Sequence, residues 1–191
     1  MARPAEAQVR QRWSDFVLLP EDDRRELVDG VLLEVEMPTK WHEFICAFLI
    51  KTLMTWGERR GLVVLGSGYR VRINDHRGAV PDVQLLTEAT YDAAGPNGLE
   101  SGHPELVIEV VSPSSRTHDG LRKLDWYAKI GVPEYWLVNP ETRSLVVHRL
   151  QHGVYAIVQH AEGQEVFRSK TFKGLRVPLA SLWARLPKKL E

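Results

Sequence analysis

Two segments carry the most informative pattern in the chain: VPDVQLL at residues 80–86 and PELVIEVVSPSSRTHDGLRKLDWYAKIGVPEYWLV at residues 104–138. Residues 106–111 are apolar apart from Glu109, which is typical of a strand covered on both faces. An unpaired carboxylate there is costly, so Glu109 must be protonated, paired or bound to a cation. Asp82 poses the same problem in the strand expected over residues 80–86.

A helix is expected over residues 116–130, because the Ser-Pro-Ser-Ser loop before it offers capping hydroxyls. At 100° per residue, one broad arc of this helix is apolar: Leu121, Leu124, Tyr127, Ala128 and Ile130. Lys123 falls inside this arc, so we expect it to point toward the interior. The two strand carboxylates are its nearest candidate partners in the sequence.

Length and composition favour a single domain spanning residues 1–191, with its core at about 18–182 and a flexible terminus at 1–8. The formal net charge is zero, so overall charge gives no sign of nucleic acid or membrane binding. The single cysteine, Cys46, excludes an intrachain disulfide and favours a cytoplasmic protein. No apolar run approaches the ~20 residues of a membrane span, so no membrane partner is expected.

The N-terminal part predicts a short helix over residues 9–19 and a hairpin over residues 27–33, where Asp-Gly favours a tight turn. Glu26 and Glu34 lie on the arms of this hairpin. Each of them, taken alone, is read as an exposed hairpin charge.

Residues 41–60 predict an amphipathic helix, and His42 projects between the directions of Leu49 and Leu53 on its apolar side. Two interpretations of His42 stay open. It is a core histidine satisfied by a backbone carbonyl, which we slightly favour, or it faces a cleft and a substrate.

The remaining pattern predicts a mixed β-sheet with helices on its faces, an α/β (α+β) fold. A strand at residues 69–73 is expected to pair antiparallel with the strand that bears Asp82, and residues 87–103 are expected to form a surface loop. The other elements expected are a buried strand at 134–139, a hairpin of 144–150 with 154–159, and an edge strand within 165–172.

The order strand-Pro-Asp, strand-Glu, helix-Lys resembles the PD-(D/E)XK nuclease superfamily, the restriction endonuclease-like fold. More narrowly, ELVDG at residues 26–30, PDV at 81–83 and the run at 105–138 resemble the Uma-type restriction endonuclease family, a large bacterial group first catalogued as a domain of unknown function. The likeness covers residues 18 to about 182. His42, twelve residues after Gly30, matches a position where that family tends to place a histidine.

The resemblance implies a metal-dependent endonuclease that hydrolyses phosphodiester bonds in DNA. Asp82 and Glu109 would hold Mg²⁺, or Mn²⁺, together with the backbone carbonyl of Val110. Lys123 would orient the attacking water or stabilise developing negative charge. The superfamily's lysine usually lies two residues after the glutamate, where this chain has Val111, so Lys123 would be a relocated lysine.

Four further residues are weaker candidates for the same cleft. Asp119 lies one turn before Lys123 and is either a partner of that lysine or a helix-terminus acid. Tyr127 is read as a packed residue with a bonded hydroxyl rather than as a catalytic acid. Glu34 and His42 would be brought in by the hairpin and by the helix at residues 41–60.

Two alternatives belong to other classes of protein. The first is a nuclease-like fold kept as a nucleic-acid-binding or oligomeric interaction module without turnover, which the neutral charge and Val111 motivate. The second treats Asp82, Glu109 and Lys123 as ordinary ion-paired residues. A homo-oligomer, dimer or tetramer, is also expected, because six tryptophans exceed what a small core readily hides; Trp126 and Trp183 are the candidates for an interface.

Overall fold

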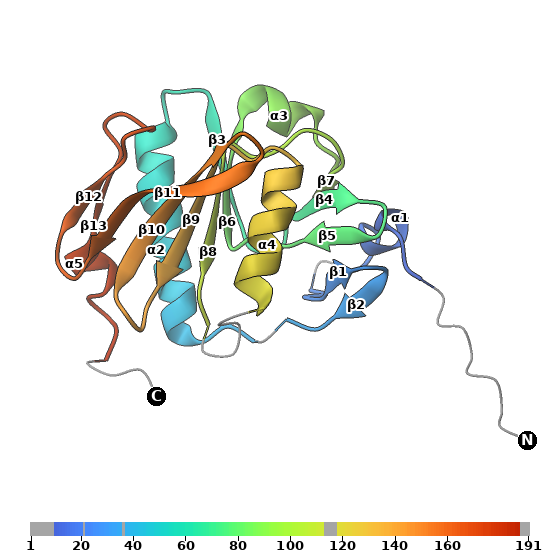
Figure 1. Cartoon of the computed structure of the whole chain (residues 1–191), viewed down its shortest axis with the longest axis horizontal. Helices are drawn as coiled ribbons and strands as arrows, with labels where there is room; N and C mark the ends of the chain where they lie inside the picture. The colour runs from blue at the N-terminus through green and yellow to red at the C-terminus, as the bar shows by residue number, and fades with distance from the viewer. Residues whose placement is uncertain (1–9, 21, 36, 113–117, 188–191) are drawn as a thin grey trace, which may run out of the picture.

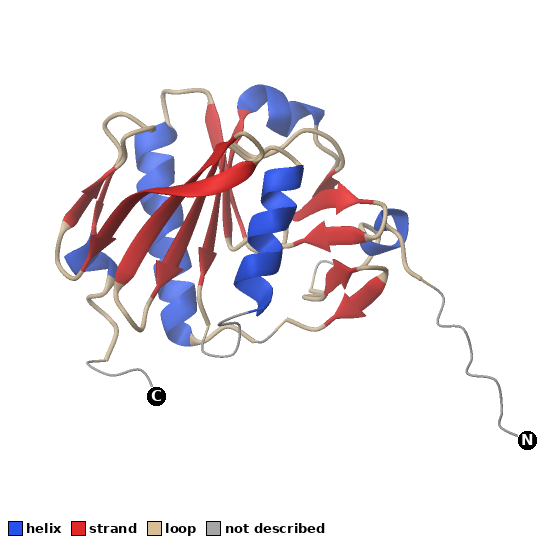
Figure 2. Cartoon of the chain, in the orientation of Figure 1, coloured by secondary structure: helices blue, strands red, loops and turns tan. Residues whose placement is uncertain are grey.

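The computed structural model describes residues 10–20, 22–35, 37–112 and 118–187, without the side chains of residues 118–121. Six strands form the main sheet in the order β11-β10-β9-β8-β6-β3, shown in Figures 1 and 2. Its strands are β3 (Leu62–Gly66), β6 (Val83–Thr87), β8 (Leu106–Val110), β9 (Glu134–Asn139), β10 (Ser144–Gln151) and β11 (Val154–Glu162). Only β8 and β9 are parallel neighbours in this sheet; the other pairs are antiparallel.

The side chains of β8 alternate between two cores, which places a helix on each face of the sheet. Leu106, Ile108 and Val110 pack in the core that contains the apolar face of α2 (Lys40–Gly57). Val107 packs with Trp126 and Tyr127 of α4 (His118–Lys129). In Figure 1 α2 lies behind the strands and α4 in front of them. By this alternation Glu109 shares the α4 face of the sheet with Val107.

A second sheet of five short strands lies beside the first, in the order β2-β1-β5-β4-β7. Its strands are β1 (Glu26–Val28), β2 (Val31–Leu33), β4 (Arg70–Asn74), β5 (Arg77–Ala79) and β7 (Gly98–Leu99). The expected Asp-Gly hairpin is present as β1 and β2, and Asp29 and Gly30 both have positive φ, as a tight two-residue turn requires. Pairing of β1 with β5 joins this hairpin to the rest of the chain.

Short elements complete the described part of the chain. They are α1 (Trp13–Phe16), α3 (Glu88–Ala93), α5 (Leu179–Leu182) and the two-stranded ribbon of β12 (Val166–Arg168) with β13 (Arg176–Pro178). None of the helices in the described ranges is long and apolar enough to cross a membrane.

Three expectations about local structure were wrong. The strand at 70–74 does not pair with the strand that follows Asp82; it pairs with β5 and β7, while β6 pairs with β3 and β8. Residues 87–103 are not a plain loop, since they contain α3 and β7. In the described part of the chain, the helix expected at 9–19 is only the four residues of α1, whose Trp13 and Phe16 pack in a small core with Leu27.

The structure does not expose the two tryptophans suggested for an interface, while Trp41 and Trp56 are only partly buried. Trp126 and Trp183 are buried within this chain, as are Trp13 and Trp136. The fold therefore hides these rings without a partner, and oligomerisation stays a prediction with no support from them.

Candidate functional site

Strand β8 and helix α4 bring Glu109 together with two side chains. Lys123 and Tyr127 lie one turn apart on α4, so they share one face of the helix. The Lys123 Nζ is 3.1 Å from Glu109 Oε2, and the Tyr127 hydroxyl donates a hydrogen bond of 2.7 Å to Glu109 Oε1. All three residues are buried. Lys123 therefore points inward, as the helical pattern predicts, and Tyr127 has the bonded hydroxyl that was expected.

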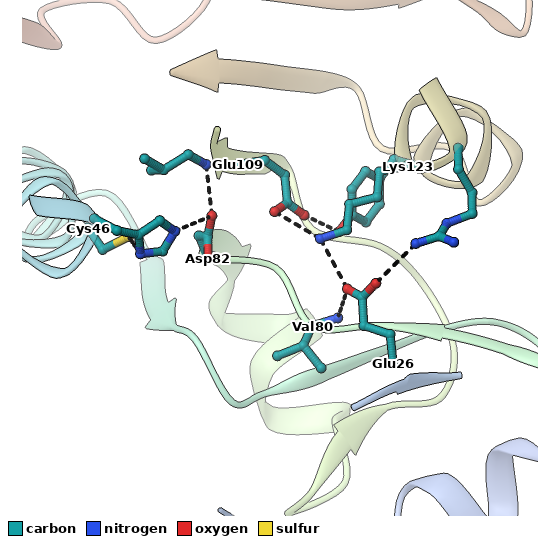
Figure 3. A network of polar contacts seen from close by, with 10 residues as sticks. Glu26, Cys46, Val80, Asp82, Glu109 and Lys123 are labelled. Atoms are coloured by element: carbon teal, nitrogen blue, oxygen red, sulfur yellow. Dashed lines mark hydrogen bonds and ion pairs between the residues drawn. The ribbon is translucent and has the colours of Figure 1, made fainter. Parts of the chain in front are cut away.

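Strand β1 adds a second buried carboxylate, Glu26, which is only 2 % exposed. Its Oε1 lies 3.1 Å from Lys123 Nζ and accepts a 3.3 Å hydrogen bond from the backbone N–H of Val80. Its Oε2 lies 3.7 Å from an Arg122 guanidinium nitrogen. Figure 3 shows Lys123 between the carboxylates of Glu26 and Glu109. We call Glu26, Glu109, Lys123 and Tyr127 the lysine flank of the site.

The sequence interpretation missed Glu26 because each glutamate of the hairpin, taken alone, looks like an exposed charge. The hairpin carboxylate that enters the site is Glu26, whereas Glu34 is exposed. The structure therefore does not bring Glu34 into the site, contrary to the expectation from the sequence. A usable signal was present, since Glu26 is the first residue of the ELVDG segment that carries the family resemblance.

Asp82 lies in a bend directly before β6. Its Oδ2 accepts a 2.8 Å hydrogen bond from the backbone N–H of Val110, the last residue of β8. The same oxygen is 3.2 Å from His42 Nε2, on the first turn of α2. The other ring nitrogen of His42, Nδ1, is 3.6 Å from the sulfur of Cys46. We call Cys46, His42 and Asp82 the histidine flank of the site.

His42 is inward-facing, as predicted, but the favoured partner was wrong. A carboxylate, not a backbone carbonyl, satisfies its Nε2, because the bend before β6 carries Asp82 up to the N-terminal turn of α2. Val110 enters the site through its N–H, which fixes Asp82. The side chain of Asp119 lies outside the described residues.

Burial dominates the electrostatics of the lysine flank. It raises the pKa of Glu109 to about 8, although Lys123 and the Tyr127 hydrogen bond pull that pKa down; the charges of Asp82 and Glu26 push it further up. Burial also raises the pKa of Tyr127 well above its ordinary value, and the charge of Glu109 adds to this. Tyr127 is therefore a neutral donor, and Glu109 holds a proton near neutral pH unless a cation compensates its charge.

On the histidine flank, the influences on the pKa of His42 oppose one another. Burial by itself lowers the pKa of His42, but the hydrogen bond and the charge of Asp82 together outweigh it, so that pKa is raised. Burial raises the pKa of the Cys46 thiol, with a further contribution from Asp82. This flank therefore carries a thiol and an imidazole that gains a proton more readily than a free histidine.

The arrangement of Asp82, Glu109 and Lys123 on this sheet is typical of one class of fold and site. Carboxylates at the ends of two neighbouring central strands, with a lysine from the next helix, lie on a mixed sheet flanked by helices. The crystal structure of a "putative nuclease belonging to DUF820" from Anabaena variabilis has the same fold: the TM-score is 0.73 at 20 % identity, over 90 % of this chain and 96 % of that chain. The restriction endonuclease-like fold expected from the sequence is therefore confirmed.

The chain belongs to the Uma2 family, described as "Putative restriction endonuclease", whose family model matches residues 13–180. This confirms the family resemblance on which the sequence interpretation rests. No curated protein matches the chain.

The donor set fits the divalent metal that such a family implies. Glu26 and Glu109 flank Lys123, and Asp82 lies close enough to Glu109 for its charge to raise the pKa of that carboxyl. Carboxylate oxygens are the ligands that Mg²⁺ and Mn²⁺ prefer. Burial is the main cause of the raised pKa of Glu109, and a dication beside this carboxyl would favour its ionised form.

Proposed function

We propose that this protein is a divalent-metal-dependent endonuclease that hydrolyses phosphodiester bonds in DNA. The convergence of Asp82, Glu109 and Lys123 carries the proposal. These residues come from the start of β6, from β8 and from α4, and they meet at one end of the main sheet. The chain belongs to a family described as "Putative restriction endonuclease", and this membership supports the same reaction.

In this proposal Asp82 and Glu109 hold Mg²⁺ or Mn²⁺, together with the backbone carbonyl of Val110. The bound metal supplies a water of lowered pKa and neutralises charge on the scissile phosphate. The N–H of Val110 and the ring of His42 hold the Asp82 carboxylate in position. A ligand whose orientation is fixed in this way loses less freedom when it binds the metal.

Lys123 donates from its ammonium group to the attacking water or to a phosphate oxygen, where it stabilises negative charge as that charge develops. Glu26 and Glu109 hold its Nζ from two sides, each at 3.1 Å. At the position where the superfamily usually has its lysine, two residues after the glutamate, this chain has Val111. The Nζ of Lys123 reaches Glu109 from α4 instead. This reach supports the proposal that Lys123 takes the place of the missing lysine, whose absence was one of two reasons to consider a module without turnover.

An arginine-rich surface next to the site supports a nucleic-acid substrate. The guanidinium groups of Arg122 and Arg77 lie over the Trp126 ring, with centroid distances of 5.2 and 5.8 Å. Arg77 also lines a groove with Arg10 and Arg72 at the turns of the second sheet. Guanidinium groups bind phosphates in a bidentate manner, and phosphate contacts dominate affinity for nucleic acid. The groove also contains Asp29 and Asp75, which pair with Arg77 and Arg72.

The experiment is cleavage of supercoiled and linear DNA, and of RNA, with Mg²⁺, Mn²⁺ or chelator. Asp82→Asn and Glu109→Gln should each lower the metal-dependent rate by at least roughly 100-fold, the scale on which loss of a charge-stabilising group acts. Asp125→Asn is the matched control: its carboxylate is exposed on α4 and paired with Lys129, so the rate should stay near wild type.

Equal rates in wild type and in both site variants would overturn the proposal. Binding of DNA in chelator, with no product under either metal, would instead indicate a nucleic-acid-binding module. Cleavage of RNA alone would keep the reaction and change the substrate.

A further inference from the structure

The histidine flank contains three metal-ligating groups, of which the proposed reaction uses only Asp82 as a metal ligand. His42 and Cys46 lie one helical turn apart on α2, so their side chains point to the same side. Asp82 reaches them from the bend before β6. One ligand atom from each of these residues can be chosen so that all three atoms lie within 4.8 Å of one another.

Each of two separations is close to that expected between neighbouring ligands of a tetrahedral metal centre, but they involve opposite ring nitrogens of His42 and so correspond to alternative positions of the ion. Bond lengths of about 2.0 Å to nitrogen or oxygen and about 2.3 Å to sulfur put neighbouring ligand atoms roughly 3.3 to 3.6 Å apart. The Cys46 sulfur is 3.6 Å from His42 Nδ1, and Asp82 Oδ2 is 3.2 Å from His42 Nε2. A single ion binds one ring nitrogen, so the third ligand must approach by side-chain rotation across the 4.8 Å span.

The chemistry of this set differs from that of the carboxylates around Lys123. Thiolate and imidazole favour zinc and similar ions of borderline softness, whereas Mg²⁺ prefers oxygen ligands and keeps its waters. Three protein ligands leave a fourth position for water, as in open zinc sites. Cys46 is the only cysteine in the chain, so no second thiol competes for an ion or forms a disulfide within the chain.

Burial and charge are compatible with an ion at this position. The side chains of His42 and Asp82 are 14 % and 17 % exposed, which leaves an approach from solvent, while Cys46 is buried behind them. Burial, followed by the charge of Asp82, raises the pKa of the Cys46 thiol. A cation at this position would offset that negative charge, and binding would release the thiol proton.

We propose that His42, Cys46 and Asp82 form a binding site for a borderline divalent metal of the zinc type, distinct from the Mg²⁺ position between Asp82 and Glu109. The two positions share Asp82. Occupation by zinc therefore draws Asp82 away from Mg²⁺, and Zn²⁺ inhibits metal-dependent cleavage. The metal-binding part of this inference does not depend on the protein being a nuclease.

Co²⁺ tests the site directly, because a thiolate bound to cobalt gives a charge-transfer absorption band in the near ultraviolet and this chain has a single thiol. The reduced full-length protein is titrated with Co²⁺, and the cobalt is then displaced with Zn²⁺. The wild type should develop the band to one equivalent and lose it on addition of Zn²⁺. Cys46→Ser should show no band. His42→Ala should bind Co²⁺ at least ~100-fold more weakly, since even partners outside the ligand shell change metal affinity 10–100-fold.

Glu109→Gln is the matched control, because it removes a carboxylate of the Mg²⁺ position and leaves the three proposed zinc ligands. It should keep the cobalt band while losing cleavage, so failure of the nuclease proposal and failure of the zinc site give different results. No band in the wild type, or equal Co²⁺ affinity in wild type and His42→Ala, would overturn the site. Either outcome would assign Cys46 and His42 to positioning Asp82 by hydrogen bonds.

Discussion

The two flanks of the site give a buried carboxylate different partners. On the lysine flank, Glu109 and Glu26 share the ammonium group of Lys123, and both are almost completely buried. On the histidine flank, Asp82 receives a backbone N–H and an imidazole, and its side chain is 17 % exposed. One flank pairs its carboxylates with an ammonium group, and the other pairs Asp82 with an imidazole, whose charge changes near neutrality.

This difference separates the roles of the two carboxylates. Glu26 lies between Lys123 and Arg122, whereas Glu109 pairs with Lys123, and burial raises the pKa of Glu109. Asp82 is held by the backbone N–H of Val110 and by His42, whose pKa is raised by the neighbouring carboxylate. We therefore expect the lysine flank to dominate both stability and its pH dependence, and the histidine flank to contribute little to stability.

The largest expected effect is that of Lys123→Met, which keeps an unbranched apolar stem of similar length but removes the charge. Glu26 and Glu109 would then lie buried without their shared cation, and loss of one partner from a buried ion pair costs about 3–5 kcal/mol. Urea unfolding measures this loss as a shift in the transition midpoint.

The matched control for Lys123→Met is Lys129→Met on the same helix. Lys129 is about half exposed and pairs with Asp125 at 2.6 Å. An exposed pair of this kind contributes at most about 1 kcal/mol. Equal losses in the two variants would show that the buried cation gives no special stabilisation, and the contrast between the flanks would fail.

A second expected effect is a pH dependence of stability that belongs to Glu109. Its pKa is about 8 in the folded protein against an ordinary value of 4.5. Between these values the folded protein holds a proton that the unfolded chain has lost, so the free energy of unfolding falls as pH rises. The slope is at most about 1.4 kcal/mol per pH unit.

Urea unfolding in chelator, at a series of pH values, isolates this contribution as the difference between wild type and Glu109→Gln. The variant should lack the fall between pH 4.5 and 8 that wild type shows. Added Mg²⁺ should stabilise wild type most at the upper end of this range, because the metal competes with the proton. Parallel curves for the two proteins would mean that Glu109 is ionised throughout.

The smallest expected effect is that of His42→Gln. Because the pKa of His42 is raised above 6.5 in the folded protein, its ion pair with Asp82 stabilises fully below that value and is lost as pH rises through the folded pKa. We expect a loss of about 1 kcal/mol at acidic pH, the scale of one hydrogen-bonded contact, and less at alkaline pH.

His160→Gln is the corresponding control, since His160 is half exposed and its Nε2 lies 4.0 Å from Glu162. It should leave the unfolding midpoint unchanged at both ends of the pH range. A loss for His42→Gln that matches the loss for Lys123→Met would remove the distinction between the flanks.

The local features of the structure could be predicted from the sequence because they depend on the periodicity of apolar residues. The apolar run around Glu109 identifies a strand covered on both faces, and the structure places an α-helix on each face of β8. The position of Lys123 in the apolar arc of its helix predicted the inward direction that brings it to Glu109. The sequence also predicted the Asp-Gly turn of the hairpin and the helix that carries His42. Both depend on side-chain spacing and backbone preference, which act over a few residues.

The tertiary structure alone decided which distant groups meet. Glu26 joins Lys123 because β1 pairs with β5 and so lies beside α4, a pairing that no periodicity encodes. The bend at Asp82 gives His42 a carboxylate partner, whereas the contact of His42 with Cys46 follows from their spacing of one turn on α2. The sequence by itself determined which side chains turn inward, because burial is a local pattern. Only the fold determined their partners, because partners are set by strand pairings between remote segments.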